Sequence, residues 1–430
     1  MSIQRHGGAR ASVELEITAL GGRGDAVARL DDGRVVFVPG GVPGDRVVVH
    51  LSGKRRGVMR GEIVELVRPS PHRRAARCPV ARRCGGCQWQ HIDLQQQHTD
   101  KASNIARAVG IEVEPMGQVP EFGWRRRVRF HLRRQEGAVR AGYMEATSRR
   151  LIATETCPVL EPSLERLLPV VAAWADPWLE RGECLAHAGL EGVIIRVQGV
   201  SRARPPGLDE ATLERLGVAG VTLALGQRVQ SVGLSEVTLS ETEGSDPITV
   251  DAAGFSQASG AANEAIRAAV TAALEGVPLS EAAVELYAGS GNLTGALLRR
   301  FDRVSTWEWE RAAVRRARRR YADAIDAGKL AVHCGDVAER APQPSAGEVW
   351  LLDPGRPGAA QVCERLAGAP VDDLIYVSCA ADTLARDLKI LAQGGLTPAR
   401  AWWVDTFPQT PHAEAIVHLR RASAAENKNP

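Results

Sequence analysis

The chain has 430 residues, a length that predicts two or three domains, and 44% of its residues are hydrophobic, which argues against general disorder. Its formal net charge is only +3, so the total charge does not identify a partner. No stretch reaches the ~18 apolar residues that a membrane-spanning helix needs, and residues 1–12 lack the apolar core of a secretory signal. We therefore expect a cytoplasmic protein with no membrane partner, in which eight cysteines indicate metal binding or catalysis rather than disulfide bonds.

Residues 11–69 predict a small β-barrel. Short apolar or alternating runs separated by glycine turns indicate strands at residues 13–17, 34–38, 45–51 and 58–67. Strands this short and closely spaced are typical of oligonucleotide-binding barrels. The segment resembles the TRAM domain, an RNA-binding barrel, through the glycine turn near Gly24 and the runs at residues 36–40 and 42–47.

Residues 70–250 predict a mainly β unit that begins with a cysteine-rich loop. The loop has the spacing Cys78-x5-Cys84-x2-Cys87, and Cys157 supplies a fourth thiol. Four thiolates suit either zinc or an iron–sulfur cluster, and the spacing alone does not decide between them. Helical patterns occur at residues 94–109, 163–174 and 209–216.

A basic strip follows Trp124 in this unit. From Arg127 the sequence alternates, which predicts a strand with Arg127, Arg129, His131 and Arg133 on one face and Val128, Phe130 and Leu132 on the other. Such a strip suits contacts to phosphates, although a solvent-exposed charged face is the alternative. We predict that Arg127, Arg129 and Arg133 bind RNA.

Residues 251–430 alternate between helix and strand, which predicts a doubly wound, Rossmann-like α/β domain whose ligands bind beyond the carboxyl ends of the strands. Strands are expected at residues 283–287, 303–307, 330–333, 349–353 and 374–378, and helices at residues 263–274 and 311–324. The whole chain is thus predicted to be an α/β multidomain protein.

The first strand of this domain leads into a glycine turn of the kind that binds nucleotides. Gly289 and Gly291 allow close approach to the backbone, and the following helix offers free N–H groups. The turn alone fits dinucleotide and S-adenosyl-L-methionine sites alike, but the full dinucleotide pattern fails because Gly295 comes one place late. Glu308 ends the next strand, where it can bind ribose hydroxyls, and Asp336 ends the third, where adenine would lie. This layout indicates a class I methyltransferase that uses S-adenosyl-L-methionine.

A nucleophile and a carboxylate occur at the same edge of the predicted sheet. Cys379 ends an apolar strand, Glu414 follows downstream, and Asp353 ends a third strand. Methylation of uracil C5 needs a thiolate that adds to C6, and then a base that removes the C5 proton so that the thiol can leave. Cys379 and Glu414 suit these two roles, and Asp353 can form a hydrogen bond with the uracil ring.

Several motifs together resemble the RNA 5-methyluridine (uracil-C5) methyltransferase family over nearly the whole length of the chain. They lie at residues 255–257, 286–291, 353–358, 378–379, 383–387 and 405–414. The resemblance implies that Cys379 is the nucleophile and Glu414 the base. It also implies that Gln257 and Asp353 lie at the uracil ring and the cofactor. Tyr287, Glu308 and Asp336 are implied to bind S-adenosyl-L-methionine.

The same resemblance implies a [4Fe–4S] cluster on the four cysteines, because their pattern precedes residues 88–91 as it does in the family. The order of barrel, cluster domain and methyltransferase domain is similar to members that act on 23S ribosomal RNA, and we expect a monomer. Departures from the family pattern occur at Ser259 and Ala380, where the family has asparagine, and at Gly355 and Ala381, where it has proline. A uridine C5 methyltransferase of tRNA, or an RNA-binding protein that has lost catalysis, remain as alternatives.

Overall fold

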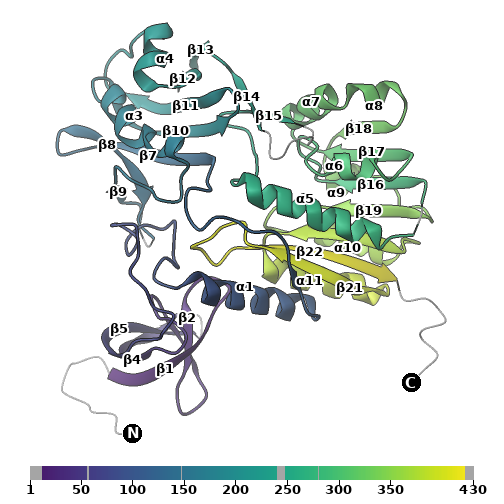
Figure 1. Cartoon of the computed structure of the whole chain (residues 1–430), viewed down its shortest axis with the longest axis horizontal. Helices are drawn as coiled ribbons and strands as arrows, with labels where there is room; N and C mark the ends of the chain where they lie inside the picture. The colour runs from purple at the N-terminus through teal and green to yellow at the C-terminus, as the bar shows by residue number, and fades with distance from the viewer. Residues whose placement is uncertain (1–11, 56–57, 147, 240–246, 279, 422–430) are drawn as a thin grey trace.

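The computed structural model describes residues 12–55, 58–146, 148–239, 247–278 and 280–421, with the side chains of residues 53–58 left out. Residue 11 of the predicted barrel and residues 422–430 of the predicted third domain lie outside these ranges. Three β-structures lie beside one another, a barrel, a central sheet and a C-terminal sheet flanked by helices (Figure 1). No helix in the described part of the chain is both long and apolar enough to cross a membrane.

The N-terminal strands close into the predicted small barrel, in the order β1-β2-β3-β5-β4. Closure leaves no open sheet edge, and alternate apolar side chains fill the interior. The buried Trp89, from beyond the barrel, completes this core and donates from Nε1 to the carbonyl of Gly24 at 2.9 Å. The strands are β1 (Ser12–Leu20), β2 (Ala26–Arg29), β3 (Val35–Val38), β4 (Arg46–Arg55) and β5 (Val58–Arg68).

The central unit is a seven-stranded sheet in the order β13-β12-β11-β10-β7-β8-β9. Its strand β7 alternates as predicted, with Val128, Phe130 and Leu132 buried in the core that helices α3 and α4 cover. The strands are β7 (Arg127–Gln135), β8 (Ala138–Met144), β9 (Leu151–Ala153), β10 (Leu179–Gly189), β11 (Gly192–Ser201), β12 (Gly220–Leu225) and β13 (Arg228–Gly233). The helices are α2 (Pro162–Glu165), α3 (Leu167–Ala175) and α4 (Glu210–Leu216), and a hairpin of β14 (Glu236–Leu239) and β15 (Ile248–Asp251) leads onward.

The C-terminal sheet has eight strands in the order β18-β17-β16-β19-β20-β22-β21-β6. The five predicted parallel strands are confirmed as β16 (Ala282–Leu286), β17 (Arg303–Glu308), β18 (Leu330–Cys334), β19 (Glu348–Leu352) and β20 (Asp373–Ser378). Beyond them, β22 (Glu414–Arg421) is inserted antiparallel between β20 and β21 (Leu396–Val404), and β6 (Glu114–Pro115) forms the edge. The sequence patterns did not predict these last three strands.

Helices cover both faces of this sheet, as a doubly wound fold requires. The core on one face includes residues of α1, α9, α10 and α11, and the core on the other includes residues of α5, α6 and α8. The helices are α5 (Gly260–Glu275), α6 (Thr294–Leu298), α7 (Arg311–Arg320), α8 (Ala322–Asp326), α9 (Val337–Arg340), α10 (Ala360–Ala367) and α11 (Ala381–Gln393). The prediction of a single helix over residues 311–324 was wrong, because the helix is interrupted at Tyr321. The hydroxyl of Tyr321 donates to Gly291 O at 2.9 Å.

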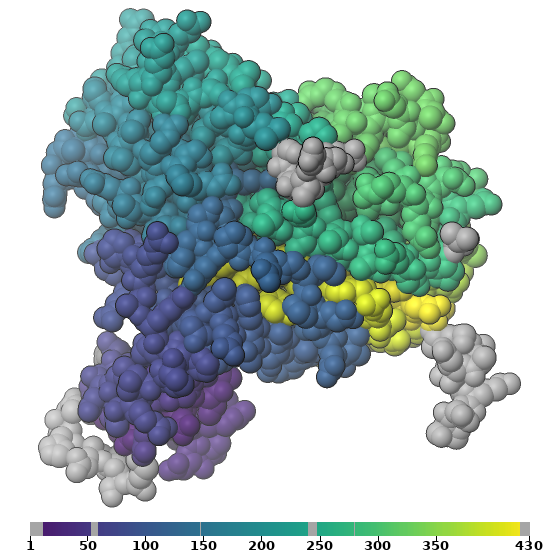
Figure 2. Space-filling view, viewed as in Figure 1, coloured from purple at the N-terminus to yellow at the C-terminus, as the bar shows by residue number. Residues whose placement is uncertain are grey.

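Helix α1 (Leu94–Val109) has the bounds that the sequence predicted and lies between the barrel and the C-terminal sheet (Figure 1). Asp93 caps its start by accepting from Gln96 N, and Gly110 ends it in the left-handed conformation. On the barrel side Asp100 accepts from the backbone N–H of Leu20 at 3.1 Å, and on the other side the helix packs against α11 and β21. Figure 2 shows the blue segment that starts in α1 covering part of the yellow C-terminal strands.

Candidate active site

The glycine turn after β16 is built by left-handed backbone. Tyr287, Gly289 and Gly291 have φ angles of 64°, 57° and 83°. Glycine adopts such angles readily, whereas Tyr287 has a side chain that disfavours them. Positive φ at a tyrosine is uncommon and marks a backbone position that its surroundings hold in place. Burial raises the pKa of the Tyr287 hydroxyl to about 12, and the charge of Asp336 also contributes. The Tyr287 hydroxyl therefore lies within the electrostatic influence of Asp336.

The two predicted cofactor acids are held by backbone N–H groups. Glu308, largely buried at the end of β17, accepts from Gly289 N at 2.9 Å and from Glu310 N at 2.8 Å. Asp336 is exposed and caps α9, accepting from Ala338 N at 2.8 Å. These bonds fix each carboxylate at the carboxyl edge of the sheet, and each retains acceptor capacity for a hydroxyl or an amine.

The predicted nucleophile and base come from neighbouring antiparallel strands. Ser378 at the end of β20 pairs with Ala415 in β22, and continuing this register by one position brings Cys379 beside Glu414, whose charge acts on the Cys379 thiol. Side chains directly opposite in an antiparallel pair point to the same face, with Cβ atoms about 5 Å apart. The chain topology thus brings together two residues that are 35 positions apart in the sequence.

The charges at this edge act strongly on one another. Burial, followed by the carboxylates of Glu414 and Asp353, raises the pKa of the Cys379 thiol to about 12, whereas the guanidinium of Arg356 lowers it. Burial raises the pKa of Asp353 to about 7, and burial and Asp353 raise the pKa of Glu414 well above its usual range. Glu285 in the adjacent strand is also affected, since burial raises its pKa to about 8. The motif at residues 353–358 contains Arg356 but does not mark it as a charge of the site, and no motif includes Glu285.

The positions that depart from the family pattern have local structural explanations. Ala380 is the N-cap of α11 and makes no side-chain cap bond, and Ala381 is the first residue of that helix. Asparagine and proline are favoured at these two places, so the change removes a helix cap rather than a reacting group. Ser259 caps α5 by accepting from Ala262 N at 3.2 Å, and a Cβ at Gly355 would meet only Pro357 Cδ at 3.7 Å.

Gln257 lies where the central unit meets α5. Its carbonyl accepts from Arg126 Nε at 3.2 Å, and the neighbouring Phe255 side chain is exposed, with the guanidinium of Arg127 4.6 Å from its ring centroid. Burial lowers the pKa of Arg127 to about 10 and also lowers the pKa of His131, another member of the predicted basic strip. His131 and Arg133 line an open groove of about 470 Å³ with Arg181 and Arg196, whereas Arg129 lies 3.8 Å from Glu183.

The four predicted cysteine ligands gather at one place. The pKa of the Cys87 thiol is raised to about 12 by burial and then by the charges of Cys157, Cys84 and Cys78. Cys87 and Cys157 also pack against the same small core around Trp124. Within the described residues, however, no three histidine, cysteine or carboxylate side chains converge closely enough to hold a single metal ion.

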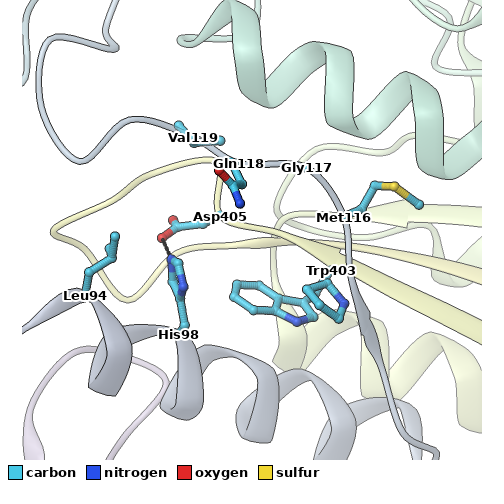
Figure 3. A pocket seen from close by; sticks show the side chains of 9 residues that line it. Leu94, His98, Met116, Gly117, Gln118, Val119, Trp403 and Asp405 are labelled. Carbon is cyan, nitrogen blue, oxygen red and sulfur yellow. Dashed lines mark hydrogen bonds and ion pairs between the residues drawn. The ribbon is translucent and has the colours of Figure 1, made fainter.

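A cavity of about 690 Å³ lies outside the predicted site, between α1, residues 115–119 and the end of β21 (Figure 3). No predicted catalytic or cofactor residue lines it. His98 reaches from α1 to Asp405, with Nε2 3.1 Å from Oδ2, and lies edge-on to Trp403 (Figure 3). Asp405 begins the segment that connects β21 to Glu414, so this cavity borders the start of that segment.

Comparisons with known proteins agree with this architecture. The TRAM domain family matches residues 10–64. The chain is 32% identical to the 23S rRNA (uracil(1939)-C(5))-methyltransferase RlmD of Edwardsiella ictaluri, over 94% of this chain and 95% of that protein. It is also 32% identical to an uncharacterized RNA methyltransferase of Thermosynechococcus vestitus, over 97% and 99% of the two chains. The fold resembles that of the Pyrococcus abyssi tRNA (uracil-54, C5)-methyltransferase, with a TM-score of 0.75, 20% identity and coverage of 95% and 100%.

Proposed function

The chain belongs to the family of RNA uracil-C5 methyltransferases, and we propose that it methylates C5 of a uridine in 23S ribosomal RNA through a covalent adduct of Cys379. The observation that supports the covalent step is the register of β20 and β22, whose last pair, Ser378 with Ala415, is one residue from Cys379 and from Glu414. The Cys379 thiol gives up its proton and its sulfur bonds to C6 of the ring, and C5 then takes a methyl group whose bond to the sulfonium sulfur of S-adenosyl-L-methionine breaks. Glu414 next accepts the C5 proton, the C5–C6 double bond re-forms, and the bond from C6 to sulfur breaks.

The residues at the glycine turn fit S-adenosyl-L-methionine, which supplies a methyl group on a sulfonium when bound. We assign the ribose hydroxyls to Glu308, whose two oxygens each accept one backbone N–H and keep further lone pairs. Asp336 and Tyr287 would face the adenine, and Gly289 and Gly291 allow close approach of the cofactor. Asp353, with a pKa of about 7, and Gln257 would orient the uracil ring.

The covalent step is tested with RNA that contains 5-fluorouridine, because fluorine at C5 cannot leave as a proton. The wild-type protein with S-adenosyl-L-methionine is expected to form an adduct that survives SDS, and Cys379→Ala is expected to bind the same RNA without forming one. If the wild type forms no adduct and transfers no methyl group to unmodified RNA, the protein is an RNA-binding member that has lost catalysis.

Ribosomal RNA is proposed as the substrate because the similar Edwardsiella protein is named for 23S rRNA and the similarity spans nearly both chains. The tRNA alternative comes from the fold likeness to the Pyrococcus protein. Mapping 5-methyluridine in a deletion strain separates the two. Loss of the modification from 23S rRNA supports the proposal, and loss confined to tRNA contradicts it.

We also propose that Cys78, Cys84, Cys87 and Cys157 hold a [4Fe–4S] cluster. In such a cluster each thiolate binds its own iron, and the charges of Cys157, Cys84 and Cys78 all act on the Cys87 thiol. When bound, the cluster would link Cys157 to the loop of the other three. Iron and acid-labile sulfide in protein purified without oxygen, both lost in Cys87→Ser, would support this, and stoichiometric zinc would contradict it.

RNA binding is assigned to the barrel and to β7, where Arg127, Arg129 and Arg133 alternate with buried residues. Arginine and lysine contacts to phosphate provide affinity that falls as salt rises. Filter binding of the arginine variants over a range of salt concentrations tests this assignment.

A further inference from the structure

The segment that leads to the proposed base, Glu414, contains neither helix nor strand. Residues 405–413, here called the base loop, connect β21 to Glu414 at the start of β22. A tight antiparallel connection needs only about two residues, so a loop of this length is not positioned by its ends alone. Glu414 itself pairs with Val404 of β21, which holds its backbone, and the residues of the base loop that lead up to it are held by other contacts.

Gln409, in the middle of the base loop, is fully buried and has a left-handed backbone with φ of 73°. All four of its polar atoms are hydrogen-bonded. Its N–H donates to Gln97 Oε1 at 2.9 Å, and its carbonyl accepts from Trp89 N at 2.9 Å. Its side-chain Oε1 accepts from Gln97 Nε2 and from Arg74 Nη2, both at 3.1 Å, and its Nε2 donates to Glu121 Oε1 at 3.0 Å. A residue so completely bonded is held in one conformation.

Gln97 is the partner that this network depends on most. It is fully buried on α1, and its amide also donates to the carbonyls of Trp89 and Ile92 at 3.1 and 2.9 Å. One turn further along α1, the buried Lys101 binds Asp405 at 2.6 Å and donates to Phe407 O at 3.1 Å. Helix α1 therefore bonds to the base loop at its start, through Lys101, and at its middle, through Gln97.

The same contacts reach the cysteine-rich loop. Trp89, whose backbone N–H binds Gln409, follows Cys87 by two residues, and Gln90 accepts from the backbone N–H of Cys78 at 2.9 Å. The Gly24 turn of the barrel is also close, since a Cβ there would meet Pro411 Cγ at 3.3 Å. The base loop is therefore fixed from three parts of the chain at once.

We propose that Gln97 and Gln409 form a positioning pair that sets where the Glu414 carboxylate lies relative to Cys379. This inference rests on the proposed roles of these two residues. A general base works only within hydrogen-bond reach of the proton it removes, and a displacement of about 1 Å costs on the order of 100-fold in rate. The pair acts on the last step, in which the C5 proton passes to Glu414 and the bond from C6 to sulfur breaks. It does not act on the earlier transfer of the methyl group.

The test uses Gln97→Leu, which keeps the size of the side chain, and Gln409→Gly, which keeps the left-handed backbone and its two hydrogen bonds. With RNA that contains ordinary uridine, both variants are expected to accumulate methylated protein–RNA adduct that survives SDS. Turnover is expected to fall by about 10- to 100-fold, with KM for RNA and binding of S-adenosyl-L-methionine changed less than about threefold. Gln95→Leu, on the exposed side of α1, is the matched control and should resolve its adduct as the wild type does.

Two outcomes overturn the proposal. Wild-type turnover without accumulated adduct would show that the pair does not position the base. Loss of adduct, methyl transfer and cofactor binding together would show that the pair only maintains the fold. Failure of the proposed function is recognised separately, because the wild type would then form no adduct even with RNA containing 5-fluorouridine.

Discussion

Replacing the proposed base by glutamine is expected to make the nucleophile more reactive toward a small alkylating reagent. Glu414→Gln keeps the shape of the side chain but removes a negative charge that, after burial, contributes most to the raised pKa of Cys379. The thiolate is the reacting form, so a lower pKa increases its amount. This result is opposite to the loss of methyl transfer that the same substitution should cause.

The size of the effect follows from the pKa of about 12 for Cys379. At pH 9 this pKa leaves about one thiol in 10³ ionised, and removing a nearby like charge lowers the pKa by about one unit, which gives about tenfold more thiolate. The intrinsic reactivity of a thiolate falls by about threefold for each unit of pKa, so the net gain is about three- to fourfold. Because Glu414 acts on Cys379 only when it is ionised and its own pKa is raised, the gain should be larger at pH 9 than at lower pH.

The assay is alkylation by iodoacetamide followed by peptide mass spectrometry, with the exposed Cys334 in the same molecule as reference. Asp353→Asn should shift Cys379 in the same direction, since its carboxylate also raises that pKa. If Glu414→Gln leaves Cys379 unchanged or slower relative to Cys334 at pH 9, the two side chains do not face each other, and the proposed pairing of nucleophile and base is wrong.

Three further results are expected. Lys101→Met should lower the free energy of unfolding in urea by about 3–5 kcal/mol, because it leaves the buried Asp405 carboxylate without its lysine partner. Adding Asp405→Leu should restore part of this loss. A change below about 1 kcal/mol in Lys101→Met would contradict the expectation. Glu285 has a pKa of about 8 in the folded protein against an ordinary 4.5, so the folded state binds the extra proton between these values and stability is lost as pH rises through 8. The Tm of Glu285→Gln relative to wild type should therefore increase from pH 5 to pH 8, and a constant difference would argue against a buried acid. Arg133→Ala should weaken RNA binding and reduce the slope of log affinity against log salt by about one, whereas an unchanged slope would place Arg133 away from phosphate.

The elements that the sequence predicted well are those whose signals are local. Helix α1 begins after an aspartate cap and ends at a glycine, and the apolar runs of the five parallel strands are bounded by turns. The position of β22 between β20 and β21 has no local signal, because antiparallel insertion depends on pairing between segments far apart in the chain. The break between α7 and α8 likewise falls at Tyr321, whose hydroxyl donates to Gly291 in the glycine turn, 30 residues earlier in the chain.

The candidate site shows the same division. Motif order was enough to select Cys379 and Glu414, but the pairing of β20 with β22, which ends one residue from each of them, has no signal in the sequence. The departures at Ala380 and Ala381 looked like changes to a catalytic motif, and the structure shows that they fall on a helix start. Gln97 and Gln409 could not be found from sequence, because a buried amide pair has neither a periodic pattern nor a characteristic spacing.

The charges of the site also limit when the thiol can react. With a pKa of about 12, about one Cys379 in 30,000 is a thiolate at pH 7.5 in the free protein. Asp353, one of the two carboxylates that disfavour ionisation, can take up the thiol proton, since burial raises its pKa to about 7. A uracil ring bound beside Cys379 changes the solvation and the hydrogen bonds of both carboxylates. Under the proposed mechanism, activation of the nucleophile is therefore expected in the RNA-bound site.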